Sequence, residues 1–139
     1  MRGANLRLPV PLGSYVVENI LYKVSFPAEF HGQSAVEAAL ALRPQVFDRI
    51  DQIAEILINT QRSAIRIIDK CGPLKSPADR DHCLQYMVAV PLLFGELNAD
   101  HYEDGFHAAH PEIDKLREKM EVVEDADFSK DYLDRDKRS

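Results

Sequence analysis

The sequence is poor in cysteine and contains no long apolar segment. Its two cysteines, Cys71 and Cys83, cannot form a disulfide framework, and neither a CxxC pair nor three clustered thiolates is present. Structural zinc and an iron–sulfur cluster are therefore disfavoured. No run approaches the roughly 18 apolar residues needed to cross a bilayer, and residues 1–13 carry prolines instead of a signal-peptide pattern. We therefore expect a soluble, unexported protein that is cytoplasmic, or in the mitochondrial matrix if the source is eukaryotic.

Several common functional motifs are also missing. The sequence contains no GxSxG, no GxGxxG and no Walker-type loop. A hydrolase, a dinucleotide-binding protein and a nucleoside-triphosphate-binding protein therefore have no support. The 17 Lys and Arg residues against 23 Asp and Glu give a net charge of −6, which opposes nucleic-acid binding because phosphate requires a basic surface. Neither nucleic acid nor a membrane is an expected partner.

Positive charge is concentrated in one segment, residues 61–80. It contains five basic residues and two acidic ones. The basic residues are Arg62, Arg66, Lys70, Lys75 and Arg80. A small polyanion such as a carboxylate substrate would be attracted to this segment. The alternative is an ordinary solvated face, because charged side chains are mostly exposed.

The length supports a single domain over residues 1–139, and the pattern of its elements indicates the α+β class. Residues 15–26 are predicted to form a strand or a short helix that ends before Pro27. Residues 53–60 are predicted to form a strand, followed by an extended or helical piece, and residues 122–123 a further short strand. Because there is no regular βαβ rhythm, we expect a two-layer sandwich of helices on a small mixed or antiparallel sheet.

Three helices are predicted, and Asn98 is a further candidate helix start. The first spans residues 33–42, before Pro44. The second begins at the capping sequence SPAD, residues 76–79, with Ser76 as the N-cap, and runs to about residue 94, kinked or shortened at Pro91. The third, residues 113–120, is short and amphipathic.

The second of these helices carries a polar stripe. Asp79, His82 and Tyr86 lie at helical spacing, so a continuous helix would place an acid, an imidazole and a phenol on one face. Such a stripe suits proton transfer, since imidazole titrates near neutrality and a phenol can donate to a developing oxyanion. The alternative is that His82 and Tyr86 are half-buried interface residues and that Asp79 only caps the helix.

Two other groups of ionisable residues stand out. Lys23, Glu29 and His31 flank Pro27, in the kind of loop where functional residues are often found, although a histidine in a loop is more often simply solvated. The other group has the ligand types of a metal site but fits no metal-binding spacing, so no metal is expected. It consists of His101, His107 and His110, together with Glu103 and Asp104.

Four runs of the sequence resemble the MmgE/PrpD family. They are residues 13–31 (GSYVVENILYKVSFPAEFH), 66–70 (RIIDK), 76–94 (SPADRDHCLQYMVAVPLLF) and 131–139 (DYLDRDKRS). The similarity extends over nearly the whole chain, from about residue 6 to residue 139. It implies that the chain is the smaller α+β domain near the C-terminus of a longer protein, whose large helical domain is absent.

The resemblance also implies an activity. The family's reaction is a cofactor-free dehydration of 2-methylcitrate to 2-methyl-cis-aconitate in propionate catabolism by the methylcitrate cycle, so we expect no cofactor and a tricarboxylate substrate. The implied partners are the helical domain of the same family and a second copy in a homodimer. Because half of the site would be missing, we expect little or no activity from the chain alone. The alternative is a non-catalytic remnant or self-associating module of the same fold.

Roles for individual residues follow from the same resemblance. Lys23 is implied as a carboxylate contact or acid, His31 as an acid or base, and His82 with Tyr86 as a pair lining the cleft. Two further residues are implied as carboxylate clamps, namely Arg80 and Lys70. Related decarboxylases have a histidine where this sequence has Glu29, so Glu29 is a rival to His31 and a possible substrate contact.

Overall fold

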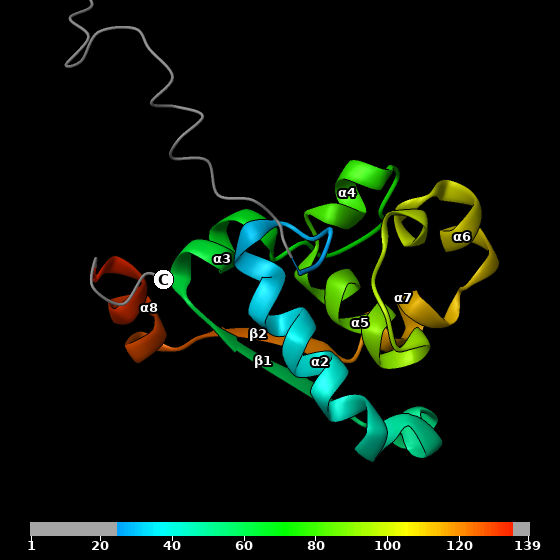
Figure 1. Ribbon diagram of the computed structural model, residues 1–139, viewed down its shortest axis with the longest axis horizontal. Coiled ribbons are helices and arrows are strands. Elements are labelled where there is room, and N and C mark those ends of the chain that lie inside the picture. The colour runs from blue at the N-terminus through cyan, green and yellow to red at the C-terminus, as the bar shows by residue number, and fades with distance from the viewer. Residues whose placement is uncertain (1–24, 135–139) are drawn as a thin grey trace, which may run out of the picture.

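The computed structural model describes residues 25–134 of the 139-residue chain and shows helices gathered around a two-stranded sheet (Figure 1). The expectations for residues 1–13, and nearly all of those for residues 15–26, lie outside the described residues. In chain order the elements are η1 (Phe30–Gly32), α2 (Gln33–Val46), η2 (Phe47–Gln52), β1 (Ile56–Thr60), α3 (Arg62–Ile68), α4 (Pro77–Asp81), α5 (Leu84–Phe94), η3 (Ala99–Tyr102), α6 (Asp104–Ala109), α7 (Glu112–Arg117), β2 (Met120–Glu124) and α8 (Ala126–Leu133).

Helix α5 forms the centre of the domain. Every residue from Leu84 to Leu92 is buried, and the helix packs most extensively against α2 and next against α7. A helix that is apolar on all sides is expected to be enclosed by other elements. The helix ends where the sequence predicts, at Gly95, whose φ of 81° is left-handed and whose N–H donates to the Pro91 carbonyl at 2.9 Å. Pro91 does not end the helix early.

The predicted helix over residues 77–94 is in fact two helices. Its start is confirmed, because the Ser76 hydroxyl accepts from the Asp79 N–H at 3.2 Å. Helix α4 then ends at Asp81, and Cys83 has an extended backbone. The break coincides with a side-chain bond to the preceding loop, since the Gln85 amide donates to the Asp69 carboxylate at 2.6 Å. The prediction of one continuous helix was therefore wrong.

The sheet is parallel, which corrects the expected mixed or antiparallel arrangement. Strands β1 and β2 pair from Ile56 with Met120 to Thr60 with Glu124. The chain between them passes through α3 to α7 and returns to the start of β1, and such a crossover makes the two strands run in the same direction. On β1, Ile58 points into the core whereas Leu57 is exposed. Helices and sheet thus form the expected α+β layers.

Other helices differ from expectation in length or existence. Helix α7 ends at Arg117, so the predicted helix over residues 113–120 was too long, and Met120 begins β2. Helix α6 was not predicted. Helix α2 is confirmed but continues through Pro44 to Val46. The extended or helical piece after β1 is the helix α3. Helix α8 was not predicted, although the Asp125 carboxylate caps it by accepting from the N–H groups of Asp127 and Phe128 at 2.8 and 3.1 Å.

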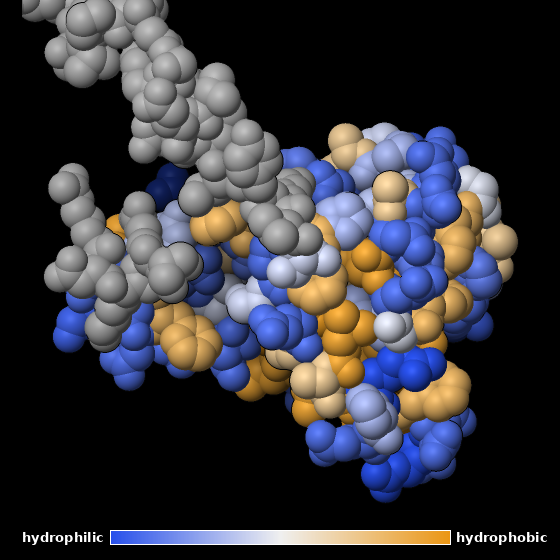
Figure 2. All heavy atoms as spheres, viewed as in Figure 1, coloured by the Kyte–Doolittle hydropathy of each residue, from blue (hydrophilic) through white to orange (hydrophobic). Residues whose placement is uncertain are grey.

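The surface is mostly polar, with apolar side chains gathered near the middle of the face shown in Figure 2. Several large apolar side chains of the domain are about half exposed or more, and they include Phe30, Ile67, Phe128 and Leu133. Within residues 25–134, no helix is both long and apolar enough to span a bilayer.

Candidate functional site

His31 lies at the centre of a short chain of polar side chains. Glu29 caps η1, and its carboxylate accepts the His31 backbone N–H at 2.8 Å while both of its oxygens lie 3.0 Å from the ring Nδ1. On the opposite side of the ring, Nε2 lies 3.1 Å from the hydroxyl of Tyr132. The side chains of His31 and Glu29 are only 11% and 15% exposed. Carboxylate, imidazole and phenol are therefore linked in series and largely shielded from water.

The order of these groups fixes the orientation of the imidazole and the position of its proton. An ionised carboxylate only accepts hydrogen bonds, so Nδ1 of His31 carries the proton shared with Glu29. Nε2 of the neutral ring then accepts from the Tyr132 hydroxyl. A carboxylate behind an imidazole also stabilises the charged form of the ring during proton transfer. The arrangement can pass a proton between His31 and Tyr132.

Tyr132 also lines a basic cleft. The cleft has a volume of about 290 Å³ and lies between α3 and α8, and its walls are formed by Gln61, Arg62, Ser63, Arg66, Glu124, Ser129, Lys130, Tyr132 and Leu133. Its cations, Arg62, Arg66 and Lys130, outnumber the single carboxylate of Glu124. A cleft with an excess of positive charge attracts anionic ligands. The cleft therefore places cations next to the proton-transfer chain.

Ser129 organises one wall of this cleft. Its hydroxyl accepts the Arg62 backbone N–H at 2.9 Å and donates to the Glu124 carboxylate at 2.9 Å. These bonds join the start of α3 to β2 and α8. The α3 arginines and the α8 residues that line the cleft are consequently held in one rigid arrangement.

The basic segment of the sequence divides between three places in the fold. Arg62 and Arg66 line the cleft, whereas Lys70 forms an ion pair with Asp79 at 2.6 Å. The hydrogen bond from Lys70 and that from the Lys75 N–H lower the pKa of Asp79 from its ordinary 3.8 to about 2. Asp79 therefore remains ionised at every pH near neutrality, and the Lys70 ammonium has a permanent partner.

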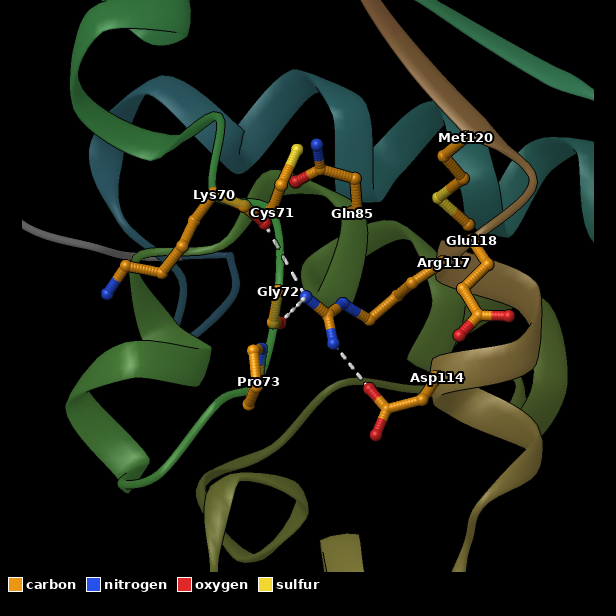
Figure 3. Close-up of a pocket in the computed structure, with 9 residues that line it drawn as sticks. All are labelled: Lys70, Cys71, Gly72, Pro73, Gln85, Asp114, Arg117, Glu118 and Met120. Carbon is orange, nitrogen blue, oxygen red and sulfur yellow. Dashed lines mark hydrogen bonds and ion pairs between the residues drawn. The ribbon is translucent and has the colours of Figure 1, made fainter.

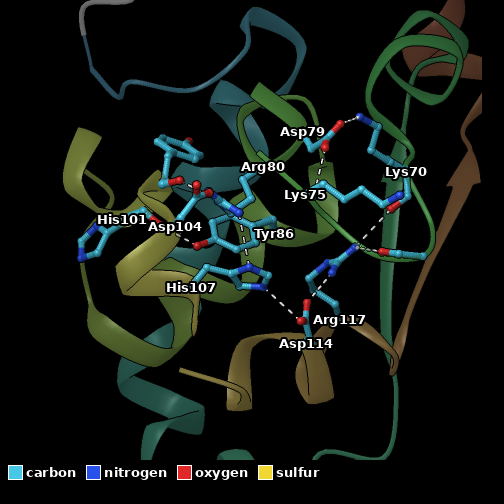
Figure 4. Close-up of polar contacts among 12 residues, drawn as sticks. Lys70, Lys75, Asp79, Arg80, Tyr86, His101, Asp104, His107, Asp114 and Arg117 are labelled. Carbon is cyan, nitrogen blue, oxygen red and sulfur yellow. Dashed lines mark hydrogen bonds and ion pairs between the residues drawn. The ribbon is translucent and has the colours of Figure 1, made fainter. Parts of the chain in front are cut away.

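Arg80 lies in the interior and is only 1% exposed (Figure 4). Its Nε donates to the Tyr102 carbonyl at 2.6 Å, its Nη2 is paired with Asp104, and its Nη1 lies 3.4 Å from Nδ1 of His107. All three guanidinium nitrogens thus have protein partners. This guanidinium is not positioned to receive a ligand without breaking one of these contacts.

The polar network continues beyond His107. Nε2 of His107 lies 3.0 Å from the Asp114 carboxylate, which is also paired with Arg117. Arg117 in turn donates to the Gly72 carbonyl at 3.2 Å. The network therefore joins α4, α6 and α7 to the loop that follows α3, which is a structural task.

Tyr86 is completely buried beside this network. Its hydroxyl donates to the His101 carbonyl at 2.6 Å, and its ring packs edge-on against His107 with the centroids 5.5 Å apart. Burial raises the pKa of Tyr86 to about 12, so the phenol stays protonated near neutral pH. In this position Tyr86 fastens η3 to α5.

The expected stripe of Asp79, His82 and Tyr86 is not formed. Because the helix breaks between Asp81 and Leu84, these three side chains do not share one helical face. His82 is 49% exposed, and its ring lies 3.6 Å from the carboxylate of Asp81. Lys23 lies outside the described residues.

The three histidines considered as metal ligands are separated by local pairings. His101 accepts the Asn98 N–H at 3.0 Å, and burial lowers its pKa, whereas His110 lies 2.8 Å from Glu112. Among residues 25–134, no three His, Cys, Asp or Glu side chains gather in a way that could hold a metal ion.

Tyr132 and Lys130 were not predicted as site residues from the sequence. Both lie on α8, in a stretch that reads as solvated charge. The capping residue Asp125, followed by Phe128, Tyr132 and Leu133 at helical spacing, was the signal that could have identified this helix.

Comparison with known proteins identifies the family of this chain. Residues 26–139 match the family model described as the MmgE/PrpD C-terminal domain. The chain is 55% identical to a mitochondrial 2-methylcitrate dehydratase of Yarrowia lipolytica over 98% of its own length and 26% of that protein. It is 53% identical to the 2-methylcitrate dehydratase of Escherichia coli K12 and 54% identical to that of Cupriavidus necator, in each case over 99% of this chain and 29% of the relative.

The chain therefore spans less than a third of the length of these relatives, and its matched region is the C-terminal one. The resemblance inferred from the sequence is confirmed, and the chain belongs to the MmgE/PrpD family, of which it represents the C-terminal domain.

Proposed function

We propose that this domain forms one side of the active site of a cofactor-independent hydro-lyase that dehydrates 2-methylcitrate to 2-methyl-cis-aconitate. The observation that carries the proposal is the hydrogen-bonded chain from Glu29 through His31 to Tyr132, which ends in the wall of a cleft with an excess of cations. A dehydration of a tricarboxylate requires both a proton-transfer group and cations for the carboxylates.

In this proposal the hydrogen-bonded chain from Glu29 through His31 to Tyr132 acts as the acid. Dehydration removes a carbon-bound proton and an adjacent hydroxyl group, and the hydroxyl leaves as water after it receives a proton. Protonated His31, stabilised by the Glu29 carboxylate, gives its Nε2 proton to Tyr132 as the Tyr132 hydroxyl protonates the departing oxygen. The base that takes the carbon-bound proton would come from outside the described residues.

The substrate carboxylates are assigned to the cations of the cleft. Arg62 and Arg66 lie one helical turn apart on α3, so both can reach a ligand in the cleft, and Lys130 faces them from α8. A guanidinium binds a carboxylate through two parallel hydrogen bonds, which also orients it. In contrast, the contacts of Arg80 and Lys70 favour structural roles for both residues.

The other residues implied by the family resemblance are assigned one by one. Lys23 remains a predicted carboxylate contact or acid. The half-exposed ring of His82 can still face a partner domain, and His82 remains a candidate. The buried hydroxyl of Tyr86 already donates to a carbonyl, so we assign Tyr86 to packing.

A second, helical domain is needed to complete the proposed site. Exposed apolar side chains near the His31 chain support such a partner, since Phe30 is 47% and Leu133 72% exposed. The homodimer and the cellular compartment stay predictions, although one of the relatives is named as mitochondrial.

A domain exchange tests the proposed function. The C-terminal domain of the Escherichia coli relative is replaced by this chain, and the ultraviolet absorbance of the unsaturated product is followed with 2-methylcitrate as substrate. We expect turnover by the chimera and little or none by the isolated chain. A folded chimera without activity would instead support the non-catalytic alternative.

Single substitutions in the chimera then test the assignment of residues. His31→Ala should lower kcat by about 10² and Tyr132→Phe by about tenfold or more, because each interrupts the acid chain. Arg66→Ala should mainly raise KM. His110→Ala is the matched control, because His110 is a partly exposed histidine of the same domain that does not line the cleft. A larger loss there than at His31 would refute this site.

A further inference from the structure

A second cleft in the domain has no part in the proposed reaction. It has a volume of about 490 Å³ and is lined by Lys70, Cys71, Gly72, Pro73, Gln85, Asp114, Arg117, Glu118 and Met120 (Figure 3). Lys70 and Arg117 are balanced there by Asp114 and Glu118, so the cleft has no charge preference for an anion. Its distinctive group is the thiol of Cys71, which is exposed.

The other cysteine lies directly behind this loop. Cys83 is fully buried, and its Sγ lies 3.4 Å from the Lys70 carbonyl oxygen, which belongs to the peptide that joins Lys70 to Cys71. A carbonyl oxygen is about 2.8 Å from the next Cα of a trans peptide, so the Cys83 sulfur lies within about 6 Å of the Cys71 Cα. A Cys83 bond to Gln85 at 3.4 Å also points the sulfur toward a residue that lines the same cleft.

Arg117 holds the backbone of the loop that carries Cys71, since it donates to the carbonyl oxygens of Lys70 and Gly72 at 3.5 and 3.2 Å, but the Cys71 side chain is exposed. Cys71, Gly72 and Pro73 are all exposed, and Gly72 has a φ of 86°, which gives the turn after Cys71 a conformation that only glycine adopts easily. Cys83, by contrast, is fixed between α4 and α5. Contact between the two sulfurs therefore requires rotation of the Cys71 side chain and a small shift of its loop.

From this juxtaposition we infer that Cys71 and Cys83 form a reversible disulfide, in which Cys71 is the thiol that reacts with a hydroperoxide and Cys83 is the resolving thiol. The inference is independent of the proposed dehydratase activity. It assigns a modification site to the second cleft, through which the oxidant reaches Cys71.

The chemistry proceeds in two balanced steps. The Cys71 thiolate attacks a peroxide oxygen, so that an S–O bond forms, the O–O bond breaks and hydroxide or alkoxide leaves. The Cys83 thiol then attacks the Cys71 sulfur, an S–S bond replaces the S–O bond, and the departing hydroxide takes the Cys83 proton to form water. One hydroperoxide is reduced for each disulfide formed, and a thiol reductant reverses the process.

Burial explains why the two cysteines have different roles in the oxidation. Desolvation raises the pKa of the Cys83 thiol, which keeps it protonated and unreactive toward a peroxide in solution. Cys71 is open to solvent and takes the first oxidation. The resulting cross-link encloses α4, which carries Asp79 and Arg80, and ties it more firmly to α5.

The test treats the reduced 139-residue chain with hydrogen peroxide, unfolds it in the presence of a maleimide, and measures intact and peptide masses. We expect the native chain to lose both maleimide adducts and two hydrogen atoms, and a peptide linking Cys71 to Cys83 to appear until a reductant is added. Cys71→Ser should keep the remaining thiol unoxidised. Cys83→Ser should accumulate a sulfenic acid on Cys71 that dimedone traps.

Three outcomes would overturn the inference. One is retention of both alkylatable thiols after oxidation, and another is an intermolecular link between two copies of Cys71. The third is equal oxidation of Cys83 in the Cys71→Ser variant, which would mean that Cys83 does not need Cys71. Because Cys71 is exposed, its serine variant should fold, which keeps the comparison valid even if the Cys83 variant does not fold.

Discussion

Two imidazoles in this domain are each paired with a carboxylate, yet their surroundings give them different uses. His31 contacts Glu29, and His107 contacts Asp114, both at 3.0 Å, and their side chains are similarly shielded, at 11% and 15% exposure. The difference lies on the other ring nitrogen. His31 meets the hydroxyl of Tyr132, whereas His107 meets the guanidinium of Arg80.

The second partner, more than burial, distinguishes the imidazole that can exchange a proton from the one that is held in a structural network. A guanidinium only donates hydrogen bonds, so Arg80 occupies the lone pair that His107 would need to accept a proton. A phenol both donates and accepts, so Tyr132 can exchange a proton with His31. The first arrangement holds elements together, and the second can take part in chemistry.

Loss of the Arg80 guanidinium should have the largest effect on stability. In the isolated chain, Arg80→Ala leaves the Tyr102 carbonyl and His107 without a buried donor, and we expect the free energy of unfolding to fall by about 3 kcal/mol. Arg66→Ala removes an exposed arginine from the cleft and should change it by less than about 0.5 kcal/mol. Urea denaturation followed by circular dichroism measures both, and similar losses would contradict the division between structural and functional arginines.

Removal of the Tyr86 hydroxyl should cost less. Tyr86→Phe leaves the His101 carbonyl buried without its donor, and we expect a loss of about 1–2 kcal/mol. Because burial raises the pKa of Tyr86 from 10.0 to about 12, the native chain should lose stability as the pH rises from about 10 to about 12. That loss should be shallower in Tyr86→Phe, and denaturation at a series of alkaline pH values measures it.

The partly exposed ion pair of Lys70 and Asp79 gives a pH-dependent contribution to stability. The pKa of Asp79, lowered from 3.8 to about 2, means that its contribution to stability is complete above about pH 4 and is lost as the pH falls toward 2. Lys70→Met should move this pKa upward but not fully, because the Lys75 N–H still donates to Asp79. A carbon-detected NMR titration of Asp79 measures the shift, and an unchanged midpoint would show that Lys70 does not hold the carboxylate.

Only a small change in stability is expected at Glu29. Glu29→Gln keeps the size of the side chain and should change stability by less than about 1 kcal/mol, since η1 keeps an oxygen at its cap. An amide can donate as well as accept, so the variant no longer fixes the proton of His31 on Nδ1. Nitrogen NMR of the imidazoles should show a changed tautomer at His31 and an unchanged one at His107, which serves as the internal control.

Local signals predicted much of the fold. The capping serine at position 76, the glycine at position 95 and the alanine-rich start of α2 all act within a few residues, and each is confirmed. The direction of β2 relative to β1 and the break before Cys83 depend on contacts between segments far apart in the sequence. Such contacts leave no local pattern, so the sheet was assigned the wrong direction and α4 was merged with α5.

The candidate site shows the same limit. Glu29 and His31 are neighbours in the sequence and were selected from it, but Tyr132 lies 101 positions beyond His31. Charge alone also grouped Arg80 with Arg62, although one is buried in a network and the other lines an open cleft. Residue type located the cations, and only packing could distinguish their tasks.

The pairing of β1 with β2 has a consequence for how the domain is made. More than half of the described chain lies between the paired residues Ile56 and Met120. A parallel pairing over such a separation requires closure of a long loop, so it forms late and slows folding compared with local helical contacts. Among residues 25–134, β1 therefore has no strand partner during synthesis until β2 has emerged from the ribosome, and in that interval its exposed Leu57 and unpaired edge are open to chaperones or to misassociation.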